Sequence, residues 1–160
     1  MSEEEEGEAP GEIFAVLLDF FEADGWPYEA LVDQPVLRLP FRGAAGNWLC
    51  FAQAREDQQQ FVFYSVYPVL VPSGRRNAMA ELLTRANYGL VVGNFELDFE
   101  DGEVRYKTSV DVEGTALSRP LVQACVYANV LMMDQYMPAI VALLAEGLEP
   151  AEALTRVEGR

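Results

Sequence analysis

The spacing of hydrophobic residues predicts three main helices. The first amphipathic stretch predicts a helix over about 12–24, and a second predicts a helix over about 75–87. A longer apolar stretch predicts a third helix over about 118–146, with Ser118 as its N-cap and Gly147 just past its end. A further short helix is expected near the C-terminus, in the sequence EPAEALTRVE.

The residues between the first two helices favour strands. The segment VLRLPF is extended, and Pro40 within it favours an edge position because proline lacks a backbone donor. The segments NWLCFAQA and FVFYSV are rich in residues that pack on a sheet, and the polar sequence REDQQ between them predicts a hairpin. Neither strand alternates cleanly between apolar and polar residues. Both faces of the sheet that these two strands form are therefore expected to be partly covered.

A second hairpin is predicted around Asp101-Gly102, in the sequence NFELDFEDGEVRYK. This dipeptide suits a two-residue type I′ turn, in which both residues have positive φ. That turn places Glu100 opposite Glu103, and then continues the ladder as follows: Phe99 with Val104, Asp98 with Arg105, Leu97 with Tyr106, Glu96 with Lys107, and Phe95 with Thr108. One face is then apolar, and the other pairs acids with bases.

The five acidic residues of this stretch also raise the question of a calcium loop. An EF-hand loop needs oxygen ligands at positions 1, 3, 5 and 12 around a glycine at position 6. With Gly102 at position 6, Asp101 fits position 5, but Leu97, Phe99 and Thr108 occupy positions 1, 3 and 12. The EF-hand pattern therefore fails, and a weak cation site at the turn, formed by Glu100, Asp101 and Glu103, stays open.

These elements predict an α+β fold in which helices cover an antiparallel sheet of about five strands. The expected order is helix, three strands, helix, two strands, helix, in a single domain over residues 12–157. Inside the third helix, Pro138 predicts a kink near residues 134–138. Asp134 stands there among apolar residues, and its carboxylate is expected to reach water or an amide freed by the kink.

Charge narrows the range of partners. The chain has a net charge of −15, and residues 1–11 contain five Glu, so they are expected to form a disordered acidic tail that serves solubility or meets a basic partner. The low content of Lys and Arg argues against nucleic acid and anionic membranes as partners. No secretory signal and no apolar run long enough to span a bilayer is recognised, so the expected location is the cytoplasm. Cys50 and Cys125 lie in apolar runs and are expected to be buried, reduced thiols.

The sequence contains no histidine and no phosphate-binding glycine loop. We therefore expect no catalytic residues, no cofactor and no dedicated metal site, and an enzyme that uses carboxylates is the least favoured class. Arg75 and Arg76 begin the second helix, where they would bind an anion or an acidic peptide, or form a solvated pair. A methionine-rich run in the third helix is a candidate groove or dimer surface, with core packing as the alternative: Met132, Met133, Tyr136 and Met137.

The stretch RANYGLVVGNFELDFEDGEVRYKTSVDVEG, residues 85–114, resembles the YbjN family of bacterial proteins, described as sensory transduction regulators. Supporting segments are VLRLPFRG, FVFYSVYPVLVP and MDQYMPAIVALLAEGLEPAEAL, so the resemblance covers about residues 12–155. The sequence NYGL before the hairpin is most similar to cyanobacterial members.

The resemblance implies a fold like that of type III secretion chaperones, which often form dimers and bind segments of other proteins. It supplies no catalytic residue and no cofactor. The expected function is therefore a non-enzymatic protein-binding or regulatory module that forms a homodimer and has an unknown protein partner. The alternative is an acidic protein that binds a divalent cation such as Ca²⁺.

Overall fold

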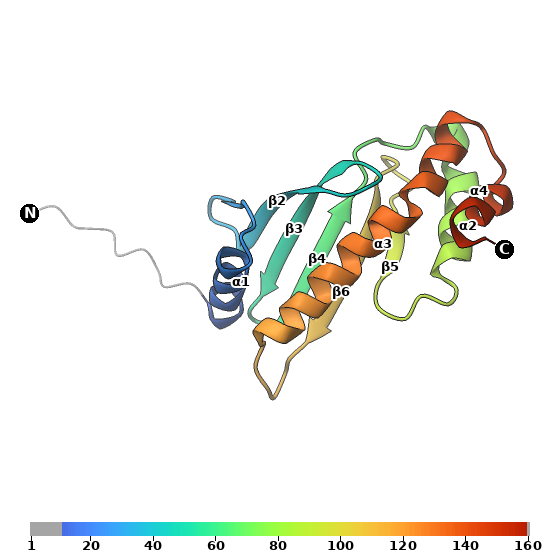
Figure 1. Cartoon of the computed structure of the whole chain (residues 1–160). Coiled ribbons are helices and arrows are strands. Elements are labelled where there is room, and N and C mark those ends of the chain that lie inside the picture. Colours follow the sequence, from blue (N-terminus) through green and yellow to red (C-terminus); the bar gives the residue numbers. More distant parts are fainter. Residues whose placement is uncertain (1–10, 160) are drawn as a thin grey trace, which may run out of the picture.

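The computed structural model of the chain describes residues 11–159 (Figure 1). The predicted acidic tail, residues 1–11, lies outside this range except for Gly11. The elements follow one another along the chain as α1 Glu12–Ala23, β1 Glu29–Ala30, β2 Val36–Arg42, β3 Asn47–Arg55, β4 Gln60–Val66, a 3₁₀ turn Ser73–Arg75, α2 Arg76–Asn87, β5 Asn94–Leu97, β6 Val104–Asp111, α3 Arg119–Ala145 and α4 Pro150–Glu158.

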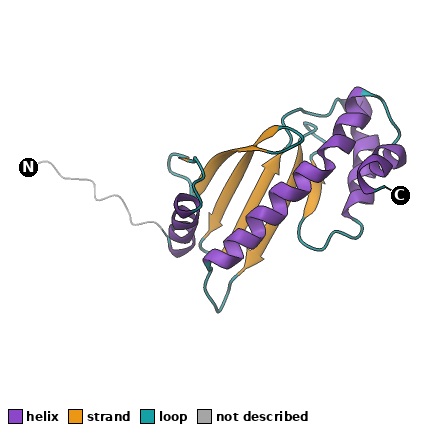
Figure 2. Cartoon of the chain, in the orientation of Figure 1, coloured by secondary structure: helices purple, strands orange, loops and turns teal. Residues whose placement is uncertain are grey.

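The six strands form one antiparallel sheet in the order β1-β2-β3-β4-β6-β5. Helix α3 runs diagonally across one face of this sheet, with α1 beside it near β2 and β3 (Figure 1). Helices α2 and α4 pack together beyond the other end of α3 (Figure 2). The predicted α+β class is confirmed, with six strands instead of about five because a two-residue β1 pairs with β2.

The core lies between α3 and the sheet. Alternate residues of each long strand are buried on this side, as in β3, where Trp48, Cys50, Ala52 and Ala54 point inward. Both cysteines are free and buried, as expected. The prediction for Pro40 is also consistent with the sheet, because β1 pairs only with Leu37 and Arg38 and leaves Pro40 without a strand on that side.

Helix α3 begins as predicted, since the Ser118 hydroxyl accepts a hydrogen bond from the amide of Leu121. The helix then continues through Pro138 without a break. By length and composition alone α3 is able to cross a membrane, so the expectation that no segment reaches that length is wrong for this helix. Half of its most apolar stretch is buried inside the fold, however, and core helices pass the same test.

The second hairpin is present, but its predicted register is wrong by two residues. Leu97 pairs with Val104, Phe95 with Tyr106, and Glu96 with Arg105 instead of Lys107. A shift of two residues keeps every side chain on its predicted face. The connection is consequently longer than a two-residue turn, and Phe99 leaves the sheet and is 54% exposed.

Hydrogen bonds inside and outside this connection explain its length. The Asp98 carboxylate accepts from the amide of Glu100, and the Asp101 carboxylate accepts from the amide of Glu103. The carbonyl of Gly102 accepts from the amide of Val71, a residue far away in the sequence. Gly102 has φ of +84°, and any side chain there would collide with the backbone of Val71, so glycine is required for this close approach.

Candidate functional site

The face of the sheet opposite α3, here called the open face, has no helix packed on it among residues 11–159 (Figure 2). The strand pairing defines its rows of side chains. Pro40, Leu49, Val66 and Arg105 form one row across β2, β3, β4 and β6. The next row consists of Arg38, Phe51, Tyr64 and Lys107. The centre of the open face is thus apolar, with cations toward both sides.

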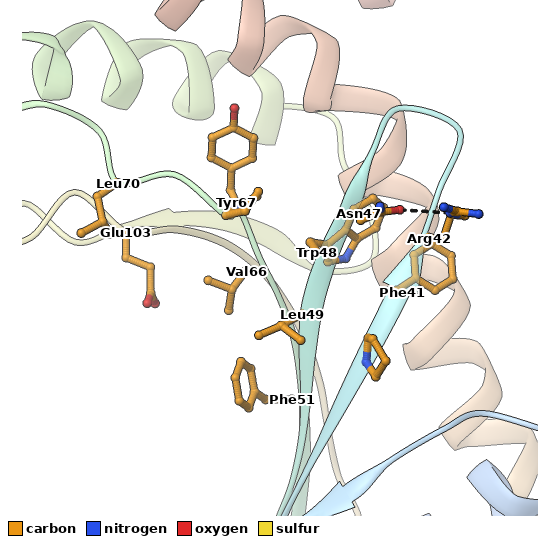
Figure 3. A pocket seen from close by; sticks show the side chains of 12 residues that line it. Phe41, Arg42, Asn47, Trp48, Leu49, Phe51, Val66, Tyr67, Leu70 and Glu103 are labelled. Carbon is orange, nitrogen blue, oxygen red and sulfur yellow. Dashed lines mark hydrogen bonds between the residues drawn. The ribbon is translucent and has the colours of Figure 1, made fainter.

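A groove of about 860 Å³ crosses this apolar centre. Its apolar lining includes Pro40, Leu49, Phe51, Val66, Pro68 and Leu70. Figure 3 shows Leu49, Phe51 and Val66 near its centre, Leu70 and Glu103 on one side and Arg42 on the other. Leu49 on β3 is 43% exposed, and Leu70, in the loop after β4, is 57% exposed.

The groove is held at both ends by contacts between distant parts of the chain. At the end formed by the β2–β3 turn, the Asp134 carboxylate of α3 accepts hydrogen bonds from the amides of Ala44 and Ala45, at 3.0 and 2.7 Å. One of the two partners expected for Asp134, an amide freed at the kink of its own helix, is therefore wrong. The amides that it binds belong to a turn about 90 residues earlier in the sequence.

At the other end, Arg76 fixes the segment after β4 to the β5–β6 connection. Its guanidinium donates to the carbonyls of Val71, Phe99 and Glu100. Arg75 instead donates to the carbonyls of Leu143 and Leu148, at the end of α3. Both guanidinium groups therefore bond backbone carbonyls of the chain, and a role of either in binding an anion or an acidic peptide stays a prediction.

The methionine-rich run lies mainly in the core. Met133, Tyr136 and Met137 are buried, and only Met132 is partly exposed. The Tyr136 hydroxyl donates to the carboxylate of Glu158 on α4, at 2.7 Å. The six predicted site residues, which include Arg75 and Arg76, therefore do not come together on one surface of the folded chain. A role of any of them in partner contact stays a prediction.

Several charged residues beside the groove form ion pairs with one another. Glu96 binds both Arg105, at 2.9 Å, and Lys107, at 3.0 Å. Partial burial raises the pKa of Glu96, but the hydrogen bonds and charges of these two bases outweigh it, so its pKa is lowered overall. The Arg105 guanidinium also lies 4.2 Å from the centre of the Tyr64 ring. This side of the open face is therefore largely neutralised.

The acidic connection between β5 and β6 was the candidate for a weak cation site. Within residues 11–159 no group of three or more His, Cys, Asp or Glu side chains is placed to hold a metal ion. The carboxylates of Asp98 and Asp101 bind amides of their own loop.

The Cys50 thiol lies in the core beside Ser65, and burial raises its pKa to about 12, so it stays protonated and is a poor nucleophile.

Sequence reasoning did not identify the groove. The available signal was the lack of clean alternation in β3 and β4, from which we expected both faces to be partly covered. No helix of residues 11–159 covers the open face (Figure 2), so that expectation is not met for this face. In β3, Leu49 and Phe51 stand on the open face and alternate with the inward residues Trp48, Cys50 and Ala52. Alternation alone does not say whether a helix of the same chain covers the second apolar face.

The segment NYGLVVGNF has a structural role at the edge of the sheet. The Asn87 side chain accepts from the amide of Phe95 at 2.7 Å and donates to its carbonyl at 3.1 Å, so it pairs with edge strand β5 as a neighbouring strand would. Gly93 has φ of +82°, and a side chain there would collide with Tyr106 and Lys107. The residues of this motif thus build the end of the sheet.

A comparison with known protein families matches residues 14–142 to the YbjN family, described as "Putative bacterial sensory transduction regulator". Among solved structures, the chain is similar to YbjN from E. coli, described as "a putative transcription regulator", with a TM-score of 0.58 and 12% sequence identity. The alignment covers 78% of this chain and 90% of the E. coli chain. A comparison with curated proteins gave no match. Since the family match extends over most of the sequence, the chain belongs to the YbjN family.

Proposed function

We propose that this protein is a non-enzymatic regulatory module of the cytoplasm, and that it acts by binding a protein chain on the open face of its sheet. The observation that carries the proposal is the apolar groove on this face, with Leu49 and Leu70 about half exposed. The family description supports the regulatory role. The resemblance to the YbjN family implies a fold like that of secretion chaperones, and this implication is the reason to propose that the module acts by binding protein.

The composition of the groove favours a protein as its ligand. Contiguous exposed apolar surface is costly in water, and in folded proteins it commonly marks a contact surface. The groove also contains Phe51 and Arg42, and aromatic residues and arginine are enriched at protein interfaces.

The rigidity of the groove supports the same proposal. Asp134 fixes the β2–β3 turn at one end, and Arg76 fixes the β5–β6 connection at the other. A surface that is already ordered loses little conformational entropy when a partner binds, so more of the contact energy appears as affinity. Neither residue takes part in any catalytic arrangement among the residues that the structure describes.

Affinity capture with a groove variant tests this proposal. The tagged full chain is compared with a double variant, Leu49→Asp and Leu70→Asp, which places charge in the groove without touching the core. Val91→Asp serves as the control, because Val91 is 94% exposed in the α2–β5 loop. We expect the wild type and the control to retain the same protein and the double variant to lose it. Equal capture by all three chains would contradict the proposal.

A further inference from the structure

The charges of the open face differ from those of the whole chain. The chain has a net charge of −15, so two copies repel each other over most of their surfaces. Five of its eleven basic residues nevertheless lie at open-face positions of the strands: Arg38, Arg42, Arg55, Arg105 and Lys107. The acidic residues at open-face strand positions are Glu29, Glu96 and Asp111. At its strand positions the open face therefore carries more bases than acids, unlike the chain as a whole.

Two charged side chains of the groove lack a partner of opposite charge. Arg42 makes only a long hydrogen bond, 3.4 Å, to the side chain of Asn47. The Glu103 carboxylate makes no hydrogen bond or ion pair to the residues that the structure describes. They stand on opposite sides of the groove, Arg42 at the end of β2 and Glu103 just before β6 (Figure 3). Three strand spacings separate them, or about 14 Å, so they do not pair with each other.

This arrangement is complementary to itself. Strands β2 and β6 lie symmetrically on either side of the boundary between β3 and β4. A two-fold axis that runs along this boundary, parallel to the strands, brings two open faces together and exchanges the two sides. Arg42 of one copy then lies over Glu103 of the other, and the same contact forms a second time. Leu49 faces Val66, and Phe51 faces Tyr64, so apolar and aromatic side chains meet at the centre. The same axis lays Arg38 over Lys107, and each of these cations has a carboxylate partner in its own copy.

We propose that a second copy of the chain occupies the open face, in a two-fold dimer in which Arg42 of each copy pairs with Glu103 of the other. This inference rests on the proposed function, because it takes the protein bound in the groove to be a second copy of the same chain. Of the other open-face cations, Arg38 pairs with Glu29, and Arg105 and Lys107 share Glu96. Arg55 stands at the far end of β3, away from the groove. Two packed sheets related in this way have the aligned geometry of a β-sandwich.

Charge reversal tests the inference by light scattering of the full chain at micromolar concentration. The wild type is expected to have the mass of a dimer. Arg42→Glu and Glu103→Arg should each raise the dimer dissociation constant by at least about tenfold, because each places like charges together twice. A mixture of the two single variants should form a heterodimer, because both of its contacts are again opposite in charge. The double variant should also recover the dimer.

The controls reverse the same charges elsewhere. Glu81→Arg and Arg85→Glu alter an exposed ion pair on α2, and both variants should remain dimers. A wild-type monomer, or single variants that do not recover when mixed, would overturn the inference. If the wild type is a monomer while the groove still captures a different protein, the inference fails and the proposed function stands. If the groove captures nothing and the chain is a monomer, both fail.

Discussion

The carboxylate of Asp134 accepts a hydrogen bond of 2.7 Å from the backbone amide of Ala45. This contact joins the middle of α3 to the β2–β3 turn, which forms one end of the groove on the other face of the sheet. Gly43 in the same turn has no room for a side chain, because a Cβ atom there would collide with the Asp134 carboxylate. Asp134 therefore ties the core helix to the turn at one end of the proposed binding surface.

Replacing Asp134 should destabilise the protein. Hydrogen bonds to a charged group contribute about 1.5–3 kcal/mol, so Asp134→Ala should lower the free energy of unfolding by about that amount. Asp134→Asn keeps the shape and one acceptor oxygen and should lose less. Urea unfolding followed by circular dichroism measures both values. The control is Gln135→Ala, an exposed neighbour on α3, and an equal loss in this control would contradict the role given to Asp134.

Asn129 is a second buried link between α3 and the sheet. Its amide nitrogen donates to the carbonyls of Phe63 and Tyr106, at 2.9 and 3.0 Å. Its side-chain oxygen has no hydrogen-bond partner among the residues that the structure describes. Asn129→Ala should cost about 1–3 kcal/mol through the lost donor. Asn129→Asp should cost more, about 3–5 kcal/mol, because it places an unpaired carboxylate against two carbonyls.

Urea unfolding at neutral pH ranks these two Asn129 variants. If Asn129→Asp were as stable as Asn129→Ala, the buried carboxylate would have to be hydrated or protonated. The site would then not be a water-free contact that requires the amide donor of Asn129.

The fold was largely predictable because local patterns specify it. The caps of α3, the amphipathic spacing of α1 and α2, and the polar turn between β3 and β4 all lie within a few residues of the feature they determine. The register of the β5–β6 hairpin was not predictable in this way. It depends on Val71 and Arg76, whose contacts with the connection arise only when the chain has folded.

The candidate site was less predictable than the fold. The helical period of α3 does not say which side meets the sheet and which meets α2 and α4, so Met133 and Met137 look like surface candidates although both are buried. The carbonyls bound by Arg75 belong to residues 143 and 148, which no sequence spacing relates to it. The groove, finally, exists because no helix of the described residues covers this face of the sheet. The sequences of the strands do not show whether a helix covers them.

Glu96 should make stability depend on pH. Its pKa is lowered in the folded chain from the usual 4.5, because the bonds to Lys107 and Arg105 outweigh its partial burial. A lowered carboxyl pKa stabilises the fold above the pKa of the unfolded chain, and this stabilisation is lost as the pH falls through the folded pKa. Glu96→Gln should therefore flatten the pH dependence of the urea midpoint below about pH 5. An unchanged slope would contradict the pairing.

The thiol of Cys50 should be unreactive in the folded protein. Burial raises its pKa to about 12, so at pH 8 the reactive thiolate is about one part in ten thousand. A thiol-exchange reagent such as DTNB should titrate both cysteines rapidly in urea and react very slowly with the native chain. Rapid reaction of Cys50 in the native chain would contradict its place in the core.

The central claim, that the open face of the sheet contacts protein, is tested most directly by a photoreactive amino acid at position 49. Leu49 lies in the groove, whereas Val91, the control position, is exposed in the α2–β5 loop. On irradiation in the producing cells, position 49 should form one discrete covalent adduct with a protein, and position 91 should not form it. No adduct at position 49, or the same adduct at both positions, would contradict the claim.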